Sequence, residues 1–499
     1  MAGEPTRTVF KGRLADERAT ACLAQDVACA LEAGDLVTLS GDLGAGKTSF
    51  ARALIRSLAC DPGLEVPSPT FPIRLDYPLE RLHVTHADLY RIGDAGEIEE
   101  IGIAEALGEG VLLVEWPERA PHLGARDCLA VSLGFDGAGR TVRLAATPEL
   151  AERLARSASV RAFLDRAGWS GASRAPIKGD ASGRAYERVT AEEGTAILMN
   201  APARPAGAPA YGGRSYDEVA HRARDVGPFL AVAHALRSAG VHAPGMIAAA
   251  PEDGFLLLED LGTEGIVTAD GRPILPRYEA AIDLLAYMHA RAWPKVVGLP
   301  GHGGHTVPPY DRDALLVEIS LFADWYLPGR ASAWTAGERH AFLAAWGEAV
   351  DRLPPGETLV LRDFHSPNIL WIEDAEGLDR VGIIDFQDAL IGHPAYDVAS
   401  LAQDARVEIA PDEEQALKAR YVAARMRADP SFDPAAFDTA YAILGAQRAT
   451  KVLGAFARLA RVEGKGGYER HSRHVAAVLA RNLAHPVLSG VRLWYDAIL

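Results

Sequence analysis

Cysteine is scarce in this chain. Among its 499 residues there are four, at Cys22, Cys29, Cys60 and Cys128, and no two of them form a Cys-x-x-Cys pair. This usage argues against a disulfide scaffold and predicts reduced core thiols in a cytosolic protein.

Long apolar runs are also missing. No stretch of the sequence approaches the roughly 18 uninterrupted apolar residues of a membrane span, and the N-terminal segment MAGEPTRTVFKGRLADE has no apolar signal core. We therefore expect a cytoplasmic protein that has no membrane partner.

An excess of basic residues is absent as well. The formal net charge of −16 argues against a broad basic face that grips nucleic acid, although a local basic patch stays compatible with it. Direct, extensive RNA binding is disfavoured. With 48% hydrophobic and 24% charged residues, the chain has ample apolar material for sizeable cores, and its length predicts more than one domain.

The pattern of apolar residues changes once along the chain. Up to about Thr147 and Pro148, short apolar runs alternate with helical patterns, which predicts an α/β sheet domain. A helical pattern over 149–170 and the stretch GASRAP follow. We place a first domain at 1–155 and a second at 160–499, with a strand-rich lobe at about 170–262 and a helical lobe at about 263–499.

The stretch SGDLGAGKTSF contains a phosphate-binding pattern. It follows an apolar run and precedes a helical one, which is the strand, loop and helix order of a P-loop, in which backbone N–H groups hold phosphate, the lysine reaches the β and γ phosphates, and the threonine binds Mg²⁺. The alternative is a glycine turn before a helix. The predicted ATP-binding positions are Gly41, Asp42, Leu43, Gly44, Ala45, Gly46, Lys47 and Thr48.

A P-loop needs carboxylates for the metal and for the attacking water. Asp88 follows the strand-like LHVTHA, and Glu115 follows the apolar VLLV, so both are candidates. Either could instead be a solvent-exposed carboxylate at the end of a strand. His83 and His86 stand three residues apart on one predicted strand and so point to opposite faces, which argues against a shared metal.

These stretches resemble a known family. GDLGAGKT, SPTF at 68–71, HADLYR at 86–91, the acidic run at 97–100 and LLVEWPER at 112–119 are similar, in order and spacing, to the small ATPase of the bacterial tRNA threonylcarbamoyladenosine machinery. The resemblance covers nearly all of residues 1–150 and implies an α/β P-loop NTPase domain that uses ATP and Mg²⁺.

The same resemblance implies roles for individual residues. Thr70 would sense the nucleotide near the metal, and Asp88 would be the second metal ligand, beside Thr48. Glu115 would be catalytic, and Trp116 would lie close to the nucleotide. The family works with a carbamoyl-transferring protein and its paralogue, so tRNA would be an indirect partner.

A second phosphate-transfer pattern lies in LVLRDFHSPNILW. Asp363 and Asn368 stand five residues apart, and the apolar strand VGII leads to Asp385 at a distance that suits a short hairpin. A kinase acting on a hydroxyl needs a base or orienting carboxylate and two metal ligands, and these side chains supply that set. The alternative is a group of unrelated loop carboxylates.

This region resembles the aminoglycoside phosphotransferase-like kinases, which have an α+β, bilobal, protein-kinase-like fold. It is more similar still to bacterial kinases of the anomeric hydroxyl of N-acetylmuramate and N-acetylglucosamine. The stretches KGDASGRAYERV, ILMNAP, GFLLLEDLGT, RDFHSPNILW and IIDFQDALIGHPAYDVASL carry the resemblance over most of residues 170–410. It implies that Asp363 is the catalytic base and that Asn368 and Asp385 bind Mg²⁺.

The resemblance also implies where ATP binds in the second domain. The loop 179–184 would lie over the phosphates, and a hinge would contact adenine. The loop contributes Ser182, Gly183 and Arg184, and the hinge contributes Glu259 and Leu261 on either side of Asp260.

Two positions depart from the kinase pattern. Leu361 replaces a largely structural histidine two residues before Asp363. Met199 stands in ILMNAP where the phosphate-binding lysine is expected, and Lys178, Arg184 or Arg188 could supply the charge instead. A nucleotide-binding pseudokinase therefore remains an alternative.

Sugar contacts are predicted in one amphipathic region. Carboxylates and an aromatic ring suit a sugar, but ordinary helix-surface residues would give the same pattern. The candidates are Asp311, Glu318, Asp324 and Trp325. His302 and His305 in GHGGH indicate a glycine-rich loop rather than a metal pair.

The sequence thus predicts two fused enzymes, an ATPase of tRNA modification and an amino-sugar kinase. The alternative is a regulatory fusion in which a pseudokinase lobe senses a sugar or nucleotide and controls the ATPase. The sequence does not identify the preferred sugar, the oligomeric state or any communication between the domains.

Overall fold

The computed structural model describes residues 7–92, 102, 106–108, 110–120, 128–177, 184–299, 303–329, 334–462 and 466–496. The chain forms two compact units. Unit 1 comprises Met1–Pro202 and Met246–Asp260, and unit 2 comprises Ala203–Gly245 and Leu261–Leu499.

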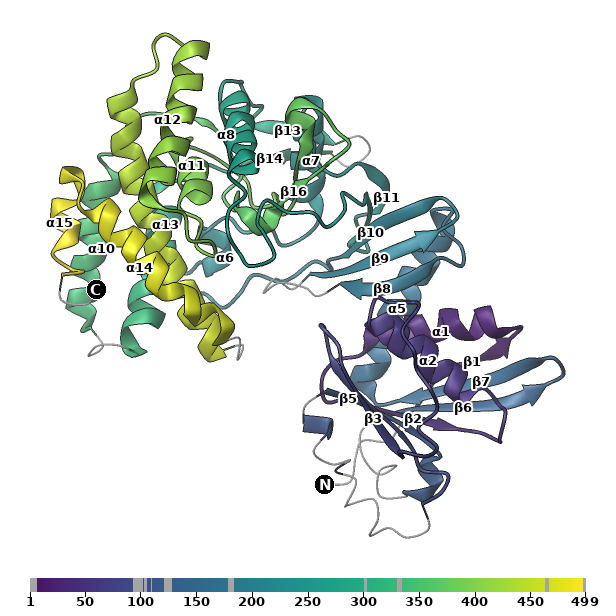
Figure 1. Ribbon diagram of the computed structural model, residues 1–499. Helices are drawn as coiled ribbons and strands as arrows, with labels where there is room; N and C mark the ends of the chain where they lie inside the picture. Colours follow the sequence, from purple (N-terminus) through teal and green to yellow (C-terminus); the bar gives the residue numbers. More distant parts are fainter. Residues whose placement is uncertain are drawn as a thin grey trace. The chain divides into compact units, whose positions relative to one another are not determined.

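Unit 1 begins with a seven-stranded sheet of order β1-β7-β6-β2-β5-β4-β3 (Figure 1, purple to blue). The central strands β6, β2, β5 and β4 are parallel, and the outer strands pair antiparallel. The elements are β1 (Arg7–Leu14), α1 (Glu17–Ala30), β2 (Leu36–Ser40), α2 (Lys47–Leu58), β3 (Arg74–Pro78), β4 (His83–Asp88), β5 (Gly110–Glu115), η1 (Pro117–Arg119), β6 (Cys128–Asp136) and β7 (Gly139–Ala146).

Both faces of this sheet are covered, as its near-continuous apolar strands require. In β2, Val37 and Leu39 belong to a core with α1 and α2, whereas Leu36 belongs to a second core on the other face. The predicted α/β domain is confirmed. It places the carboxyl ends of β2, β4 and β5 side by side.

A second sheet in unit 1 forms the strand-rich lobe. It is antiparallel, five-stranded and ordered β11-β12-β10-β9-β8. Its strands are β8 (Ser173–Ile177), β9 (Ala185–Ala191), β10 (Gly194–Asn200), β11 (Met246–Ala250) and β12 (Phe255–Glu259).

Helix α5 (Pro148–Arg166) belongs to both halves of unit 1. Leu150 and Leu154 in its first turns lie in the core of the seven-stranded sheet. Val160 and Phe163 in its later turns lie in the core of the five-stranded sheet. The segment that joins the two sheets is therefore a packed helix.

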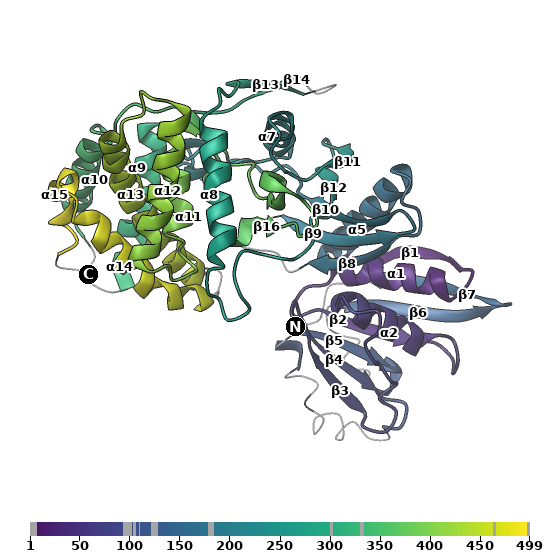
Figure 2. The same cartoon turned by 45° about the horizontal axis from the view of Figure 1, so that its top comes forward.

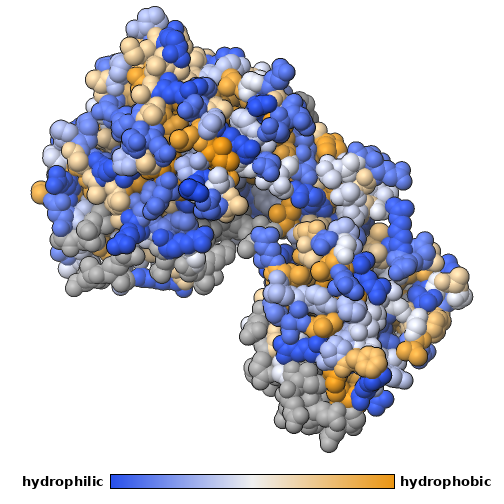
Figure 3. All heavy atoms as spheres, in the orientation of Figure 1, coloured by the Kyte–Doolittle hydropathy of each residue, from blue (hydrophilic) through white to orange (hydrophobic). Residues whose placement is uncertain are grey.

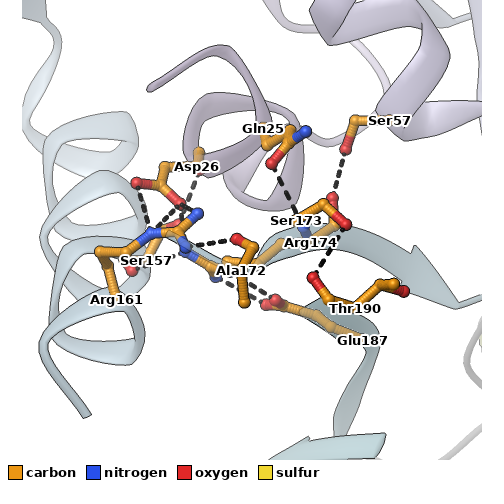
Figure 4. A network of polar contacts seen from close by, with 10 residues as sticks. All are labelled: Gln25, Asp26, Ser57, Ser157, Arg161, Ala172, Ser173, Arg174, Glu187 and Thr190. Carbon is orange, nitrogen blue, oxygen red and sulfur yellow. Dashed lines mark hydrogen bonds and ion pairs between the residues drawn. The ribbon is translucent and has the colours of Figure 1, made fainter. Parts of the chain in front are cut away.

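A buried ion network also joins the two halves of unit 1 (Figure 4). The fully buried Arg174 of β8 binds Glu187 of β9 at 2.7 Å and Asp26 of α1 at 2.7 Å. Arg161 of α5 binds the same Asp26 oxygen at 2.7 Å. The Ser57 hydroxyl of α2 donates to the Arg174 carbonyl at 2.8 Å. Helices α1 and α2 are thereby fixed against β8.

Unit 2 is mainly helical, as the sequence predicts, and α8, α11, α12 and α13 lie side by side (Figure 2). Its helices include α6 (Tyr216–Val219), α7 (Gly227–Ser238), α8 (Leu275–His289), α9 (Arg312–Leu321), η3 (Phe322–Tyr326), α10 (Ala336–Val350), α11 (Ala395–Ala402), α12 (Pro411–Ala428), α13 (Pro434–Val462), α14 (Ser472–Leu483) and α15 (Ser489–Arg492).

The described residues of unit 2 also form three small antiparallel ribbons. One of them, β16 with β17, carries the second phosphate-transfer motif at its end. The paired strands are β13 (Val296–Leu299) with β14 (Gly303–Thr306), β15 (Thr358–Val360) with β18 (Leu390–Gly392), and β16 (Ile369–Trp371) with β17 (Val381–Ile383).

The surface mixes hydrophilic and apolar residues without one dominant apolar face in the view of Figure 3. Within the described ranges, no helix is both long and apolar enough to cross a membrane. The cysteines are all free, as predicted. Cys128 is a core residue, but Cys60 is exposed at the end of α2, so the expectation of a core position was wrong there.

Candidate active sites

The first site is the loop between β2 and α2, which holds the predicted positions 41–48 together. Gly41 has φ +137°, and a Cβ there would lie 2.2 Å from the Leu133 carbonyl oxygen, so only glycine fits. Gly46 has φ +104° and precedes the first turn of α2. Arg140 donates to the Ala45 carbonyl at 3.1 Å and fixes the loop from β7.

Lys47 opens α2 and folds back over the loop. Its Nζ donates to the carbonyls of Gly41 at 2.7 Å and Asp42 at 3.0 Å, and it lies 3.7 Å from the centre of the Trp116 ring. Burial lowers the pKa of Lys47 from its ordinary value. A cation held among backbone groups at a helix N-terminus is suited to a phosphate ligand.

Glu115 ends β5 beside this lysine. The Thr48 hydroxyl donates to Glu115 Oε2 at 3.2 Å, and His86 Nε2 lies 3.1 Å from Glu115 Oε1. Glu115 and His86 are both buried, so the solvent-exposed alternative for this carboxylate is wrong. His83 instead binds Asp76 at 3.3 Å, and the two histidines therefore have separate partners.

Asp88 ends the neighbouring strand and pairs in register with Glu115. Ser68 and Thr70 have hydroxyls 3.2 and 3.4 Å from Asp88 Oδ2, and the Tyr90 amide donates to Asp88 Oδ1 at 3.0 Å. Thr70 is thus next to the carboxylate with which it was predicted to act, and Asp88 is buried.

The donor set at this sheet edge fits Mg²⁺. The predicted metal ligands Thr48, Thr70 and Asp88 offer hydroxyl and carboxylate oxygens, which are the ligands that this ion prefers. Few protein ligands are needed, because Mg²⁺ keeps waters and binds the nucleotide phosphates as well.

The second candidate site lies in unit 2. It is a loop and ribbon built around Asp363, Asn368 and Asp385. The pairing of Ile369 with Ile383 places Asn368 beside Asp385, as the predicted hairpin requires. Asn368 Nδ2 lies 3.4 Å from Asp385 Oδ2 and donates to the Asp363 carbonyl at 2.9 Å. Asp385 has φ +59°, a strained backbone that the surrounding ribbon maintains.

These side chains also fit Mg²⁺ chemically, since a carboxylate and an amide oxygen are suitable ligands. Gln387 Nε2 donates to Asp385 Oδ1 at 2.8 Å and orients that carboxylate. An unrelated set of loop carboxylates would not converge in this way.

The electrostatic surroundings keep Asp363 ionised. Burial acts to raise its pKa, but the charges of Lys451, His365 and Arg222 outweigh burial and hold the pKa well below its ordinary value. Lys451 of α13 also binds Glu318 Oε1 at 2.8 Å. An ionised carboxylate can orient a hydroxyl and accept its proton as the bond to phosphorus forms.

Buried carboxylates hold the backbone of the loop that carries Asp363. Asp397 of α11 accepts the amides of Leu361 at 2.7 Å and Arg362 at 2.9 Å. Asp404 accepts the Ser366 amide at 2.8 Å. These bonds fix the loop although Leu361 replaces the expected histidine.

The structure describes only some of the residues that are predicted to bind nucleotide in the second domain. Ser182, Gly183 and Lys178 lie outside the described residues. Arg184 precedes β9, Glu259 ends β12, and Leu261 follows two residues later. Their contacts with ATP stay predictions.

Met199, which stands where the phosphate-binding lysine is expected, belongs to the strand-rich lobe. Met199 is buried in β10, between Tyr186 of β9 and Leu256 of β12. Arg188 binds Asp260 at 2.8 Å. That ion pair engages Arg188, which makes it a weaker substitute for the lysine.

The predicted sugar contacts have other partners. Glu318 is fully buried, and its oxygens bind Arg362, Lys451, Tyr310 and Gln447, so none is left for a sugar. The prediction of a sugar contact was therefore wrong for Glu318, because its side chain is buried in α9 and pairs with buried cations.

The other sugar candidates lie around the same helix. Asp311 caps α9 and binds His221 at 3.0 Å, and Asp324 binds Arg339 at 2.7 Å. Trp325 is part-buried in the π-helical turn η3. His305 lies in β14, and His302 is outside the described residues.

Sequence reasoning missed several residues that support the two sites. His86 could have been found, because it stands two residues before Asp88 and so shares its strand face. Lys451, Asp397 and Arg140 gave no local signal, since each reaches its partner from far along the chain.

Comparisons with known proteins find two family matches, one on each side of helix α5. The family model "Threonylcarbamoyl adenosine biosynthesis protein TsaE" matches residues 14–142, and the model "Phosphotransferase enzyme family" matches residues 173–438.

Three relatives illustrate the two matches. An N-acetylmuramate/N-acetylglucosamine kinase of Caulobacter vibrioides is 35% identical over 355 residues, which are 68% of this chain and 96% of the relative. A kinase of the same name from Pseudomonas aeruginosa is 32% identical over 326 residues, 61% of this chain and 83% of the relative. A tRNA threonylcarbamoyladenosine biosynthesis protein TsaE of Rickettsia felis is 39% identical over 120 residues, 24% of this chain and 70% of the relative.

Proposed function

Because this chain belongs to the phosphotransferase enzyme family through residues 173–438 and to the TsaE family through residues 14–142, we propose that it is a bifunctional ATP-dependent enzyme. One observation carries the proposal. A P-loop with buried Glu115 and Asp88 stands in the same chain as a separate ribbon with Asp363, Asn368 and Asp385. Both reactions consume ATP, and we place them in the cytoplasm.

The kinase half transfers the γ-phosphoryl group of ATP to the anomeric hydroxyl of N-acetylmuramate or N-acetylglucosamine, for the recycling of cell-wall sugars. Asp363 orients the hydroxyl and takes its proton, while Asn368 and Asp385 would hold Mg²⁺, which would supply positive charge to the phosphates. The names of the kinase relatives support the sugars, and the ionised state of Asp363 supports its role.

The P-loop half hydrolyses ATP in support of tRNA threonylcarbamoyladenosine modification. Glu115 polarises the attacking water, and His86 positions Glu115. The proteins that complete this activity are a carbamoyl-transferring partner and its paralogue, and tRNA is bound by that complex rather than by this acidic chain.

The kinase assignment is tested with the full-length protein, ATP, Mg²⁺ and either sugar. We expect sugar-dependent ADP formation and an acid-labile product without a reducing end, because attack by the anomeric hydroxyl gives a sugar 1-phosphate. A phosphorylated product that still reduces would refute the anomeric assignment.

A second function is favoured by the buried Met199 in place of the expected lysine. In this alternative the second domain is a pseudokinase that senses a sugar or nucleotide and controls the P-loop ATPase. Sugar-dependent ATP consumption that survives Lys47→Ala supports the kinase. Loss of all sugar-dependent consumption in that variant supports the sensor.

A further inference from the structure

An open pocket of about 310 Å³ lies in unit 2 next to the catalytic ribbon. One wall is the segment that follows α6 and contains His221, Arg222 and Arg224. The pocket is also lined by His305 of β14, by Gln387 of the loop after Asp385 and by the acidic residues Asp217, Glu218 and Asp225. This volume is at the lower end of the range for small-molecule sites, which suits a monosaccharide.

The pocket wall is bonded directly to the metal-binding loop. Asp388 accepts the Ala223 amide at 2.6 Å and binds Arg222 Nε at 3.0 Å. Gln387 lines the pocket with the same side chain that donates to Asp385. Arg222 is also one of the charges that lower the pKa of Asp363. A molecule in this pocket therefore lies beside the catalytic carboxylates.

The wall offers hydrogen-bonding groups that are still available. Gln387 is buried, and within the described part of the chain its Oε1 has no partner. A buried acceptor of this kind calls for a ligand or water donor. A sugar hydroxyl or acetamido N–H would supply one.

The two arginines of the wall differ in whether they have an ion-pair partner. Arg222 is engaged by Asp388. Arg224 is exposed, and among the described residues its guanidinium makes no hydrogen bond or ion pair. Glu218, the acidic side chain whose pKa Arg224 helps to lower, is itself occupied by the Ser215 amide and hydroxyl. A free guanidinium on a pocket wall is suited to a carboxylate.

We propose that this pocket takes the acceptor sugar and that Arg224 selects the sugar that carries a carboxylate. N-acetylmuramate differs from N-acetylglucosamine by a lactyl ether with such a group, so Arg224 favours N-acetylmuramate. The inference rests on the proposed kinase function. Arg224 acts on specificity rather than on the chemical step.

The test measures kcat/KM for both sugars with the full-length protein and Arg224→Gln. We expect the ratio of N-acetylmuramate to N-acetylglucosamine to fall on the order of 10- to 100-fold, the loss typical of a charge-assisted hydrogen bond. The value for N-acetylglucosamine should stay within about twofold. Arg224→Lys should restore part of the ratio.

The matched control is Arg214→Gln, because Arg214 is also exposed but binds Asp313 at 2.9 Å outside the pocket. It should leave the ratio unchanged. An unchanged ratio in Arg224→Gln, or an equal fall in kcat/KM for both sugars, would overturn the inference and leave the proposed function standing. If the unmodified protein phosphorylates neither sugar, the proposed function fails, and the inference falls with it.

Discussion

At the scale of single residues, the two sites hold their catalytic carboxylates in different ways. Glu115 is buried and is bonded to the neutral hydroxyl of Thr48 and to His86. Asp363 lies among positive charges, of which Lys451 acts on it most strongly. In the proposed roles, the first carboxylate would polarise water and the second would orient a hydroxyl.

Replacement of Glu115 by glutamine tests its role. Glu115→Gln keeps the size and hydrogen-bonding capacity of the side chain but removes the charge, so hydrolysis should fall by roughly 10²- to 10⁴-fold while ATP still binds. The assay should include the partner proteins. Glu118→Gln is the matched control, since Glu118 is an exposed carboxylate three residues later. Equal rates in the two variants would remove Glu115 from the mechanism.

The two aspartates of the second site should respond differently to mutation. Asp363→Asn should lower kcat by orders of magnitude with little change in ATP affinity, because the lost interaction matures in the transition state. Asp385→Asn should also raise the Mg²⁺ concentration needed for half-maximal rate, because it removes a metal ligand. The same metal dependence in both variants would contradict this assignment.

Glu318 gives a prediction about acid stability. Burial acts to raise its pKa, but the charges of Arg362 and Lys451 lower it from 4.5 to about 2. Since the folded pKa lies below the ordinary value, the stabilisation is present above pH 4.5 and is lost as the pH falls through about 2. The shift corresponds to about 3 kcal/mol at neutral pH.

This dependence is measured by urea unfolding of the unmodified protein and Glu318→Gln at several pH values. The variant should be less stable at pH 7, because it leaves two buried cations without their partner. The difference should shrink as the pH falls below 4.5. A constant difference down to pH 2 would show that Glu318 does not titrate in this way.

At the scale of elements, the junction in unit 1 is a structural core rather than a flexible linker. Helix α5 packs into both cores of the unit, and Arg174 binds side chains of α1 and β9 at once. The two halves of unit 1 should therefore depend on each other for stability.

Arg174→Met tests that dependence. The substitution leaves Asp26 and Glu187 without their shared partner and should lower the free energy of unfolding by about 3 to 5 kcal/mol. Arg13→Met is the control, because the Arg13 pair with Asp136 is exposed and should contribute less than about 1 kcal/mol. Urea unfolding of the full-length protein measures both. Equal midpoints would mean that the network does not stabilise the junction.

Several elements could be predicted from the sequence because their signals are local. The P-loop between β2 and α2 and the ribbon that joins Asn368 to Asp385 follow from glycine spacing and short apolar strands. The role of α5 as a junction between two cores was harder to predict from the sequence. A helical pattern over 149–170 does not show that its two ends face different cores, because that depends on partners distant in sequence.

The same physical limit applies to the candidate sites. Motif residues such as Lys47 and Asp363 could be named from spacing. Glu318 was wrongly predicted to contact a sugar, because its cationic partners Arg362 and Lys451 lie 44 or more residues away in the sequence and gave no local signal. Charge compensation in a core is a long-range property. Such compensation can be recognised only in the folded structure, where the partners lie next to each other.

At the scale of the whole molecule, the chain carries two sets of phosphate-transfer residues. Each set has its own proposed metal carboxylate, Asp88 in unit 1 and Asp385 in unit 2, and its own proposed catalytic carboxylate. The central claim is that these are two catalytic centres, each of which works when the other is disabled.

The most direct measurement assays ATP hydrolysis with the partner proteins and sugar phosphorylation on three full-length proteins: the unmodified chain, Lys47→Ala and Asp363→Asn. Lys47→Ala should lose hydrolysis and keep sugar phosphorylation within a few-fold, because its change is confined to the P-loop. Asp363→Asn should show the reverse. A Lys47→Ala protein that no longer phosphorylates the sugar would contradict the claim and show that the two centres cannot work independently.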